Sequence, residues 1–362
     1  MPRPTTATIH LAAMRHNLSI VRRRVSNSKI WAVIKANAYG HGIERAMSGF
    51  SDADGLALIE VNDAVRLRQL GWTKPILLLQ GFFQEADLAA VIEHSLHVVV
   101  HCNEQIEMLA QIKRGPTIDV YLKMNSGMNR LGFQRGSIER AFARLRGMTG
   151  IGNIILMTHF ANSFVVGDLS KPGISVAEQT RRFLSVADAF GCGHSVADSA
   201  MVLTKTDHTC AWVRTGIMLY GATVFPERRA DEFNLLPAMT LQSDVIGVQH
   251  IAEGDYVGYG SRFMAKKPMT IGVVACGYTD GYPRSAPDGT PVLVVGVKTG
   301  LLGRVSMDSI TVDLTHVPSG RVGSKVTLWG RGLPVEEVAA AAGTIGCELM
   351  CGLTPCVRML DG

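Results

Sequence analysis

The stretch "KIWAVIKANAYGHG", residues 29–42, combines a buried-strand pattern with a lysine. Ile30, Ala32, Val33 and Ile34 form a short apolar run, which is typical of a strand covered on both faces. Lys35 follows this run directly, and turn-forming residues come after it. Two interpretations are open. Either the lysine reaches solvent, or it is held at low dielectric, where its pKa falls and its amine becomes a nucleophile.

Length and composition are those of a globular protein with two domains. The chain has 362 residues, of which 47% are hydrophobic and 19% charged. Its net charge of +5 is spread along the sequence. Short basic runs at 22–24 and 181–182 lie in helical patterns, so we interpret them as solvated faces rather than a nucleic-acid site.

The cysteines and the N-terminal residues indicate a reduced, cytoplasmic protein. Seven cysteines are present, without a Cys-x-x-Cys pair or a common zinc spacing, so no metal site is predicted. The first ten residues lack the apolar core of a signal peptide, and no stretch approaches the length of a membrane span.

Short apolar runs recur through the first 220 residues and alternate with helical patterns. Eight strands are expected, at 30–34, 55–59, 76–80, 96–101, 118–124, 154–159, 195–199 and 212–220. Helices are expected at 61–70, 86–94, 104–112, 138–146 and 176–189. Alternation of this kind predicts parallel βαβ units, and eight strands favour a (β/α)₈ barrel over an open sheet. No Gly-x-Gly-x-x-Gly follows the first strand, which argues against a dinucleotide-binding fold.

Polar residues stand at the ends of these predicted strands. They are Lys35, Lys123, His159 and Ser199, with Arg214 inside the eighth strand. In a barrel, the carboxyl ends of the strands meet at one mouth, where active sites lie. Five such residues at one mouth favour the reactive lysine over the solvent-exposed one.

The last two strands suggest a phosphate site. The segment 197–200 supplies the Ser199 hydroxyl after the seventh strand, and the segment 214–217 supplies backbone N–H groups after the eighth. Barrels often bind phosphate at these two loops. A lysine opposite a phosphate site indicates pyridoxal phosphate held on the amine, although an aldolase acting on a sugar phosphate fits equally well at this point.

The sequence pattern changes after Pro237. Helical periodicity disappears until 336–342, and turns separate short strands expected at 269–275, 292–297, 310–314 and 325–328. We therefore predict a barrel domain at 12–236 and a mostly β domain at 237–362. A strand at 6–11, within an N-terminal segment 1–11, is expected to join the β domain.

The chain resembles the alanine racemase family nearly end to end. "AVIKANAYGHG" looks like the cofactor-lysine motif of that family. Further family blocks follow in order: "LKMNSGMNRLGF", "LMTHFAN", "VRTGIMLYG", "GDYVGYGSRF", "CGYTDGYPR" and "GRVSMD". The sequence of residues 125–129 looks most like that of the proteobacterial catabolic type. The resemblance implies a pyridoxal-phosphate-dependent homodimer that interconverts L- and D-alanine, to supply D-alanine for the cell wall or to catabolise it.

The resemblance also implies roles for individual residues. Lys35 would carry the cofactor and act as one base, and Tyr259 of the partner subunit would be the opposing base. Arg214 would face the pyridine nitrogen, while phosphate would bind to Tyr39, Ser199, Gly216 and Ile217. Arg130 would hold the phenolic oxygen of the cofactor and the substrate carboxylate, supported by Lys123, which can be carbamylated in the family. His159 would orient Tyr259, and the substrate site would also include Tyr278, Met307 and Asp308.

The chemistry explains these residue types. Racemisation removes a proton from one face of the α-carbon and returns one on the other, which two opposed bases do well. Lysine and tyrosine both have reference pKa values near 10, so each must be tuned by desolvation or by a charged neighbour. Arginine keeps its proton near neutral pH, so Arg214 would leave the pyridine nitrogen unprotonated.

Some residues depart from the family pattern. Cys347 stands where tyrosine is usual, Cys356 where arginine is common, Asp198 where a neutral residue is usual, and Ser163-Phe164 replaces Ala-Asp. These changes put phosphate affinity and substrate breadth in question, so a broader serine and alanine racemase is an alternative. A non-catalytic carrier of pyridoxal phosphate would lack the β domain and Tyr259. A decarboxylase of the same fold would need a glycine-rich phosphate loop, which is not found.

Overall fold

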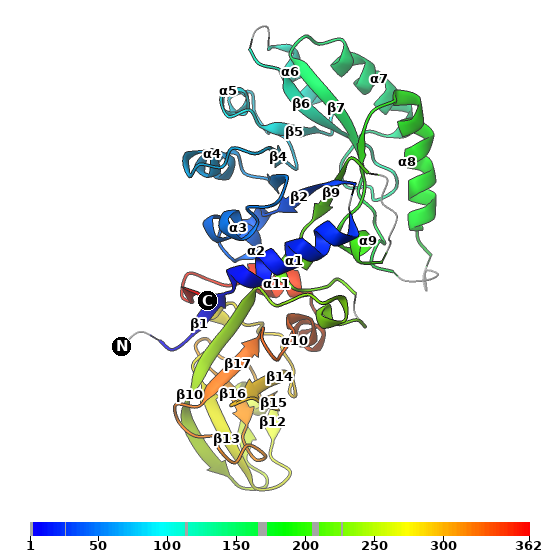
Figure 1. Ribbon diagram of the computed structural model, residues 1–362. Coiled ribbons are helices and arrows are strands. Elements are labelled where there is room, and N and C mark those ends of the chain that lie inside the picture. Colours follow the sequence, from blue (N-terminus) through cyan, green and yellow to red (C-terminus); the bar gives the residue numbers. More distant parts are fainter. Residues whose placement is uncertain (1–2, 26, 113–114, 166–171, 205–209, 226) are drawn as a thin grey trace. The chain divides into compact units, whose positions relative to one another are not determined.

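The computed structural model describes residues 3–25, 27–112, 115–165, 172–204, 210–225 and 227–362. The chain forms two compact units. One comprises residues 18–38 and 42–216 and is called the barrel unit below. The other comprises residues 1–17, 39–41 and 217–362 and is called the β unit. Figure 1 labels most helices and strands of both units.

The barrel unit contains an eight-stranded parallel sheet. Its strands are β2 (Lys29–Val33), β3 (Gly55–Leu58), β4 (Ile76–Leu78), β5 (His97–Val100), β6 (Ile118–Lys123), β7 (Ile151–Met157), β8 (His194–Ser195) and β9 (Trp212–Thr215). Their spatial order is β8-β7-β6-β5-β4-β3-β2-β9. The two outer strands are joined as well, because Ala211 N donates to His194 O at 2.9 Å and Arg214 N donates to Ala197 O at 2.9 Å. The predicted (β/α)₈ barrel is therefore confirmed.

Helices lie outside this sheet (Figure 1). They include α3 (Ile43–Gly49), α4 (Val61–Gln69), α5 (Asp87–Glu93), α6 (Asn103–Ala110), α7 (Arg135–Arg146), α8 (Val176–Phe190) and α9 (Ser199–Thr204). Each of the longer ones buries a single apolar stripe, as Phe183 and Val186 do on α8. Helix α8 is capped at its N-terminus by Ser175, whose hydroxyl accepts a hydrogen bond from Glu178 N, and at its C-terminus by Gly191 in a left-handed conformation. Helix α1 (Leu11–Arg24) precedes β2.

The β unit contains a second eight-stranded sheet, which is mostly antiparallel. Its strands are β1 (Thr6–Ile9), β10 (Met239–Ile251), β13 (Met269–Val274), β14 (Pro291–Val294), β15 (Val297–Leu302), β16 (Ile310–Asp313), β17 (Lys325–Trp329) and β18 (Arg358–Asp361). The order is β13-β16-β15-β14-β17-β10-β1-β18. Strand β1 pairs antiparallel with β10 and parallel with β18. The predicted segment 1–11 begins with residues 1–2, which lie outside the described residues, and the proposed domain limits stay a prediction.

Smaller elements of the β unit carry several predicted site residues. Strands β11 (Tyr256–Val257) and β12 (Phe263–Met264) form a separate hairpin. Short 3₁₀ helices are η1 (Ile217–Tyr220), η2 (Ala230–Phe233), η3 (Tyr259–Ser261) and η4 (Tyr278–Asp280). The α-helices are α10 (Val335–Ala342) and α11 (Gly346–Cys351).

Several strand boundaries differ from the predicted ones, and three of the differences change the path of the chain or the place of a site residue. The predicted strand 292–297 spans a hairpin turn, because Val295 and Gly296 have φ of 49° and 78°. A β-branched residue is rare at such φ values, so the apolar run concealed the turn. The predicted strand 212–220 ends at Thr215 and continues as η1, and strand β7 ends at Met157 rather than at His159.

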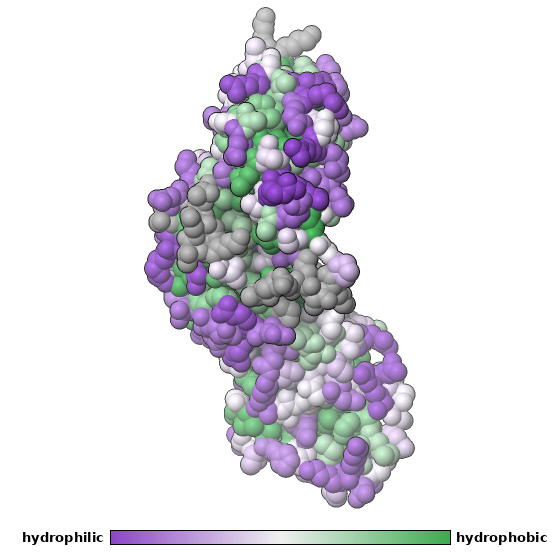
Figure 2. Space-filling model, turned by 90° about the vertical axis from the view of Figure 1, so that its right-hand side faces the viewer, coloured by the Kyte–Doolittle hydropathy of each residue, from purple (hydrophilic) through white to green (hydrophobic). Residues whose placement is uncertain are grey.

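The surface is mixed in polarity. On the face drawn in Figure 2, hydrophilic and hydrophobic residues are interspersed. Two basic runs of the sequence take part in ion pairs: Arg22 lies 2.7 Å from Asp54, and Arg181 and Arg182 both bond Glu178. Within the described residues, no helix is long and apolar enough to cross a membrane.

Candidate active site

Lys35 begins an unusual turn at the carboxyl end of β2. Element α2 (Lys35–Tyr39) is a turn of left-handed helix, in which Ala36, Asn37, Ala38 and Tyr39 have φ between 50° and 55°. Left-handed helical geometry costs an L-residue roughly 1–2 kcal/mol. Four such residues in succession mark a strained segment, and strain of this kind is concentrated at functional sites.

Hydrogen bonds from the barrel unit hold this turn in place. Ala38 N donates to Ile34 O at 2.8 Å, and Gly42 N donates to Asn37 O at 2.9 Å. The side chain of Asn37 accepts a second bond from Ile43 N at 3.2 Å. Asparagine tolerates left-handed geometry better than most residues, which suits it to this position. Lys35 therefore leaves the strand on a backbone that is fixed on both sides.

Four cations and a histidine gather at this end of the barrel. Lys123, the last residue of β6, is buried, with 8% of its surface exposed. Burial, followed by the charges of Arg214, Arg130 and Lys35, lowers the pKa of Lys123 to about 8. The pKa of His159 is lowered to about 3 by burial and then by the same cations together with Lys123. The neighbouring cations therefore disfavour a positive charge on both Lys123 and His159.

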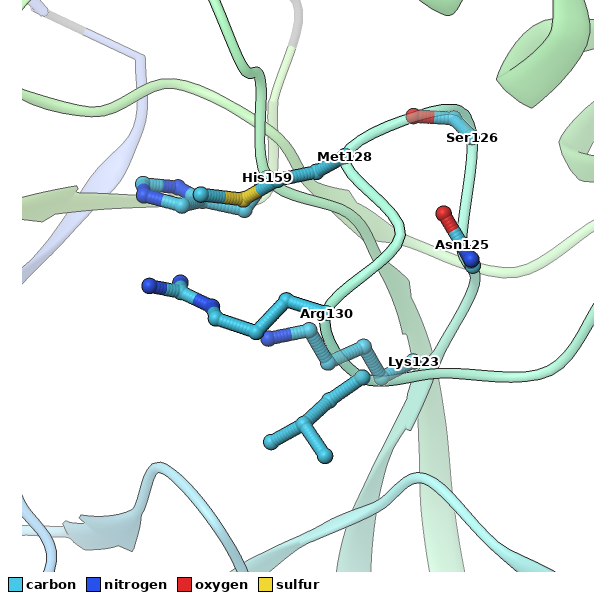
Figure 3. Close-up of a pocket in the computed structure, with 7 residues that line it drawn as sticks. Lys123, Asn125, Ser126, Met128, Arg130 and His159 are labelled. Carbon is cyan, nitrogen blue, oxygen red and sulfur yellow. The ribbon is translucent and has the colours of Figure 1, made fainter.

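The loop after β6 presents Arg130 beside Lys123. Asn125 organises this loop, because its Oδ1 accepts from Gly127 N at 3.1 Å and from Asn129 N at 3.0 Å. The loop then returns to the strand, and Phe133 N donates to Lys123 O at 2.8 Å. Figure 3 shows the side chains of Lys123, Arg130 and His159 pointing to the same side of the loop, and all three line one small pocket.

Arg214 is buried and fixed by three hydrogen bonds. Its Nη1 donates to Ser195 O at 2.7 Å and to Ser195 Oγ at 2.6 Å, while Nη2 donates to Thr158 O at 2.6 Å. Burial lowers the pKa of Arg214, and the charge of Asp198 opposes this effect. Nearby, Gly216 N donates to Ser199 Oγ at 3.0 Å, which brings together two of the predicted phosphate ligands.

His159 follows β7 and is held through its backbone. Gln179, buried on α8, donates to His159 O at 3.3 Å and accepts from Ala161 N at 2.8 Å. On the other side, Asp198 Oδ2 lies 4.0 Å from His159 Nδ1. The same carboxylate oxygen accepts from Ser163 Oγ at 2.7 Å. Asp198 is thus directed towards His159 and Ser163.

Tyr39 lies in the β unit beside two cysteines. Its ring stacks on Tyr220, with centroids 4.7 Å apart. The pKa of Tyr39 is raised by desolvation and then by the neighbouring thiols Cys347 and Cys351 on α11. Gly40 permits this close packing, since a Cβ there would lie 2.1 Å from Met350 O and its φ is 79°. Cys347 therefore lies near Tyr39, one of the residues predicted to bind phosphate.

Tyr259 is displayed at the end of the β11–β12 hairpin. Val257 of this hairpin packs in a core cluster with Ile271 and Leu302. Gly258 has φ of 77°, and Ser261 N donates to Gly258 O at 3.2 Å, which closes a tight turn around the tyrosine. Tyr259 is 72% exposed. A rigid hairpin therefore presents a largely uncovered phenol.

The three predicted substrate residues of the β unit lie on two segments that are bonded to each other. Tyr278 N donates to Ser306 O at 3.1 Å, and Thr279 N donates to Met307 O at 3.0 Å. Arg3 supports both segments, because it pairs with the buried Asp280 at 2.8 Å and donates to Asp308 O at 3.0 Å. Tyr278, Met307 and Asp308 are thus placed together.

The predicted site residues therefore fall into two groups. In the barrel unit the structure brings together Lys35, Lys123, Arg130, His159 and Arg214, with Ser199 bonded to Gly216. The β unit holds Tyr39, Ile217, Tyr259, Tyr278, Met307 and Asp308. Residue patterns missed the bonding role of Ser195, Thr158 and Gln179, since small polar residues in strands and helices carry no distinctive signal. Among the described residues, no cluster of three or more metal-binding side chains occurs.

Comparison with known proteins gives a consistent result. The family model for the alanine racemase N-terminal domain matches residues 9–224, and that for the C-terminal domain matches residues 238–360. The chain belongs to the alanine racemase family. The alanine racemase of Janthinobacterium sp. (strain Marseille) is 56% identical, covering 100% of this chain and 99% of that protein. The alanine racemase of Burkholderia mallei (strain ATCC 23344) is 50% identical and covers 98% of both chains.

Solved structures of the family share the fold. A biosynthetic alanine racemase from Pseudomonas aeruginosa superposes with a TM-score of 0.95, at 41% identity and 99% coverage of both chains. An alanine racemase from Bartonella henselae, described with covalently bound pyridoxal phosphate, has a TM-score of 0.87 at 26% identity and 100% coverage of both chains. The family, the racemase class and the cofactor predicted from the sequence are confirmed, and the catabolic type stays a prediction.

Proposed function

We propose that this chain racemises alanine with pyridoxal phosphate, using Lys35 and Tyr259 as two opposed bases. The observation that supports this proposal most strongly is the cluster of cations around Lys35 at the carboxyl end of the barrel. Lys35 is half-buried, and nearby cations favour the neutral, nucleophilic form of an amine.

The residues of the barrel unit fit an anionic cofactor. Burial and then the neighbouring cations lower the pKa values of Lys123 and His159, and a bound phosphorylated ligand would offset the repulsion among these cations. Lys35 would hold the cofactor, and Arg214 would face its pyridine nitrogen. Ser199 and Gly216 would bind its phosphate, together with Ile217 and Tyr39, which are assigned to the β unit. When bound, pyridoxal phosphate supplies a conjugated ring that takes up electrons as the α-proton leaves.

The two bases would act on opposite faces of the substrate. The Lys35 amine takes or returns the proton on one face, and the Tyr259 phenol does so on the other. Arg214 donates to Ser195 and Thr158, so it is held as a fixed cation and keeps its own proton. His159 would form a hydrogen bond with the Tyr259 hydroxyl and so orient it.

Substrate recognition would use one charged side chain and one group of loop residues. Arg130 would pair with the substrate carboxylate, as guanidinium groups do well. Lys123 would support Arg130, and an amine with a pKa near 8 is available for carbamylation near neutral pH. Tyr278, Met307 and Asp308 would limit the size of the substrate side chain.

The proposed base Tyr259 favours a homodimer. A phenol that is 72% exposed is poorly placed for proton transfer, because water competes for it. A second copy of the chain would cover this tyrosine and bring it to the partner's Lys35. We further propose that residues 12–236 and 237–362 are the two domains. We also propose that the dimer works in the cytoplasm, where it supplies D-alanine for the cell wall or degrades it.

A chiral assay tests the proposed activity. Purified protein with added pyridoxal phosphate is incubated with a panel of L-amino acids, and the D-enantiomers are measured. We expect D-alanine as the main product. Equal conversion of alanine and serine would favour the broader racemase, and cofactor binding without any D-product would favour a non-catalytic carrier.

Borohydride reduction tests the proposed cofactor lysine. The holoenzyme should be yellow, and reduction should abolish the visible band and fix the cofactor to one peptide. We expect that peptide to contain Lys35. Reduced cofactor on any other lysine would contradict the assignment.

A further inference from the structure

Asp198 faces His159 in the way that the carboxylate of a catalytic triad faces its histidine. We propose that Asp198, held by Ser163, is a positioning residue that fixes His159 in the orientation and tautomer needed to hold Tyr259. This inference rests on the proposed function of Tyr259 and deepens it. It concerns how the histidine is prepared rather than whether the tyrosine is a base.

The Asp198 carboxylate is itself fixed on both oxygens. Oδ2 accepts from Ser163 Oγ at 2.7 Å, and Oδ1 accepts from Met201 N at 3.1 Å. Only 15% of the Asp198 side chain is exposed. A carboxylate with two donors in place keeps one orientation, and here Oδ2 faces His159 Nδ1 at 4.0 Å. This separation exceeds a hydrogen bond, but catalytic contacts are often long before the site is filled.

The backbone of His159 is fixed independently of this contact. Gln179 donates to His159 O at 3.3 Å, and Arg214 donates to the carbonyl of the preceding residue, Thr158, at 2.6 Å. The imidazole is therefore attached to a rigid segment, and the remaining freedom is the ring orientation and the position of its proton. Asp198 acts on both.

An ionised carboxylate only accepts hydrogen bonds, so it selects the tautomer. Facing Asp198, Nδ1 carries the proton of the neutral imidazole, and Nε2 keeps its lone pair. A tyrosine hydroxyl that meets Nε2 then donates its hydrogen bond to the ring, which polarises the phenol. The same logic operates where a buried carboxylate holds a catalytic histidine in other enzymes.

The charges around His159 explain why a carboxylate is needed. Cations face it from four segments: Arg214 on β9, Lys123 on β6, Arg130 in the loop after β6, and Lys35 after β2. These groups disfavour positive charge on the imidazole, and Asp198 opposes them from the β8–α9 connection. Without this carboxylate, nothing described around the ring would prevent Nε2 from carrying the proton and donating to the tyrosine instead.

The test uses the holoenzyme and two substitutions, each of which nearly preserves the size of the side chain that it replaces. Asp198→Asn keeps the shape but presents an amide N–H that favours the opposite tautomer, and Ser163→Ala frees the carboxylate from one donor. Asp188→Asn, on the exposed face of α8, is the matched control. Cofactor absorbance and melting temperature verify folding. The readouts are kcat/KM from pH 6 to 10 and the isotope effect of α-deuterated L- and D-alanine.

We expect Asp198→Asn to lower kcat/KM about 10–100-fold near pH 7 and to change the pH profile of kcat/KM. The equilibrium constant of racemisation fixes the ratio of kcat/KM for L- and D-alanine, so these values alone cannot show which of the two bases is impaired. The isotope effect, measured separately for each enantiomer, can show this. The isotope effect should increase for the enantiomer that Tyr259 deprotonates and should stay unchanged for the enantiomer that Lys35 deprotonates. Ser163→Ala should produce the same pattern more weakly, and Asp188→Asn should resemble wild type.

Two results would overturn the inference. One is a loss for Asp198→Asn that is equal at all pH values, with isotope effects changed equally for both enantiomers. The other is wild-type kinetics for this variant. Tyr259→Phe, measured in parallel, separates this failure from that of the proposed function: if Tyr259→Phe is inactive, only the role of Asp198 is wrong. If Tyr259→Phe remains active, the base itself is wrongly assigned.

Discussion

Lys123 lies buried among other cations, and this placement costs stability as well as preparing a reactive amine. Its pKa is lowered to about 8 by burial, followed by the charges of Arg214, Arg130 and Lys35. An amine whose native pKa lies below the unfolded value binds its proton more weakly in the folded state. The cost is therefore full below pH 8, decreases between pH 8 and 10.5, and disappears above that range.

Replacing Lys123 by methionine should stabilise the cofactor-stripped protein in bicarbonate-free buffer. The gain in free energy of unfolding should be up to about 3 kcal/mol near pH 7 and should fade towards pH 10.5. Denaturant titrations at pH 7, 9 and 10.5 measure it, with exposed Lys266→Met as the control. A variant less stable than wild type at pH 7 would show that Lys123 has a stabilising partner, and the charge argument would be wrong.

At the residue scale the sequence predicted which side chains meet but not how they are held. Lys35, Lys123, His159 and Arg214 come from strands or strand ends, and the barrel rule alone places them at one mouth. The left-handed turn from Ala36 to Tyr39 was not predictable, because alanine and tyrosine do not favour positive φ. Asp198 was noted as unusual, but its contact with Ser163 depends on two distant loops meeting.

The loop between β6 and α7 shows how an element places a functional side chain. Gly132 has φ of 117°, and a Cβ there would lie 2.8 Å from Lys123 O and from Asn125 N. Glycine is needed for this close return of the loop, which in turn sets the position of Arg130. Gly136, four residues later at the start of α7, has open space around it.

These two glycines form a matched pair for mutation. Gly132→Ala should destabilise the protein by about 2–4 kcal/mol and should raise KM for alanine, because Arg130 moves. Gly136→Ala should stabilise it by roughly 0.5–1 kcal/mol, with unchanged kinetics. Thermal unfolding and steady-state assays give both values. A Gly132→Ala variant with normal KM would mean that the loop does not position Arg130.

Helix α11 carries the departure at Cys347, near Tyr39. A tyrosine there would add one charge-assisted hydrogen bond to the cofactor phosphate, on the order of 1.5–3 kcal/mol. Cys347→Tyr should therefore slow cofactor loss about 10–100-fold and lower the serine-to-alanine ratio of kcat/KM. Cys347→Phe, which fills the same space without the hydroxyl, should change the ratio but not the retention. If neither variant changes either quantity, Cys347 lies away from the cofactor.

Helices and strands were predicted well where the hydrophobic periodicity extends over many residues. They were predicted poorly where that periodicity is broken or where the strand is very short. The helices at 61–70 and 176–189 match α4 and α8 closely, because each has a clear apolar stripe. The 13-residue strand β10 was not predicted, because its buried Thr240 and Ser243 are polar and its exposed Ile246 is apolar, which breaks the hydrophobic alternation of the sequence. Strand β8 has only two residues and its predicted range was too long, because hydrogen bonds rather than hydrophobicity define it.

At the scale of the whole molecule, we propose that the two bases of each site come from different subunits. Tyr259 is 72% exposed on a rigid hairpin. Closed two-fold symmetry is the commonest arrangement of soluble oligomers, and it would give each dimer two equivalent sites. Each site would then combine Lys35 of one subunit with Tyr259 of the other.

Subunit complementation tests this central claim most directly. Lys35→Ala and Tyr259→Phe proteins, each nearly inactive alone, are mixed, dissociated and re-associated, and heterodimers are quantified with two affinity tags. Random pairing should restore about a quarter of the wild-type specific activity, because half of the dimers are mixed and each has one intact site. No recovery despite proven heterodimers would contradict the account, since Lys35 and Tyr259 would then not act as opposed bases across the subunit interface.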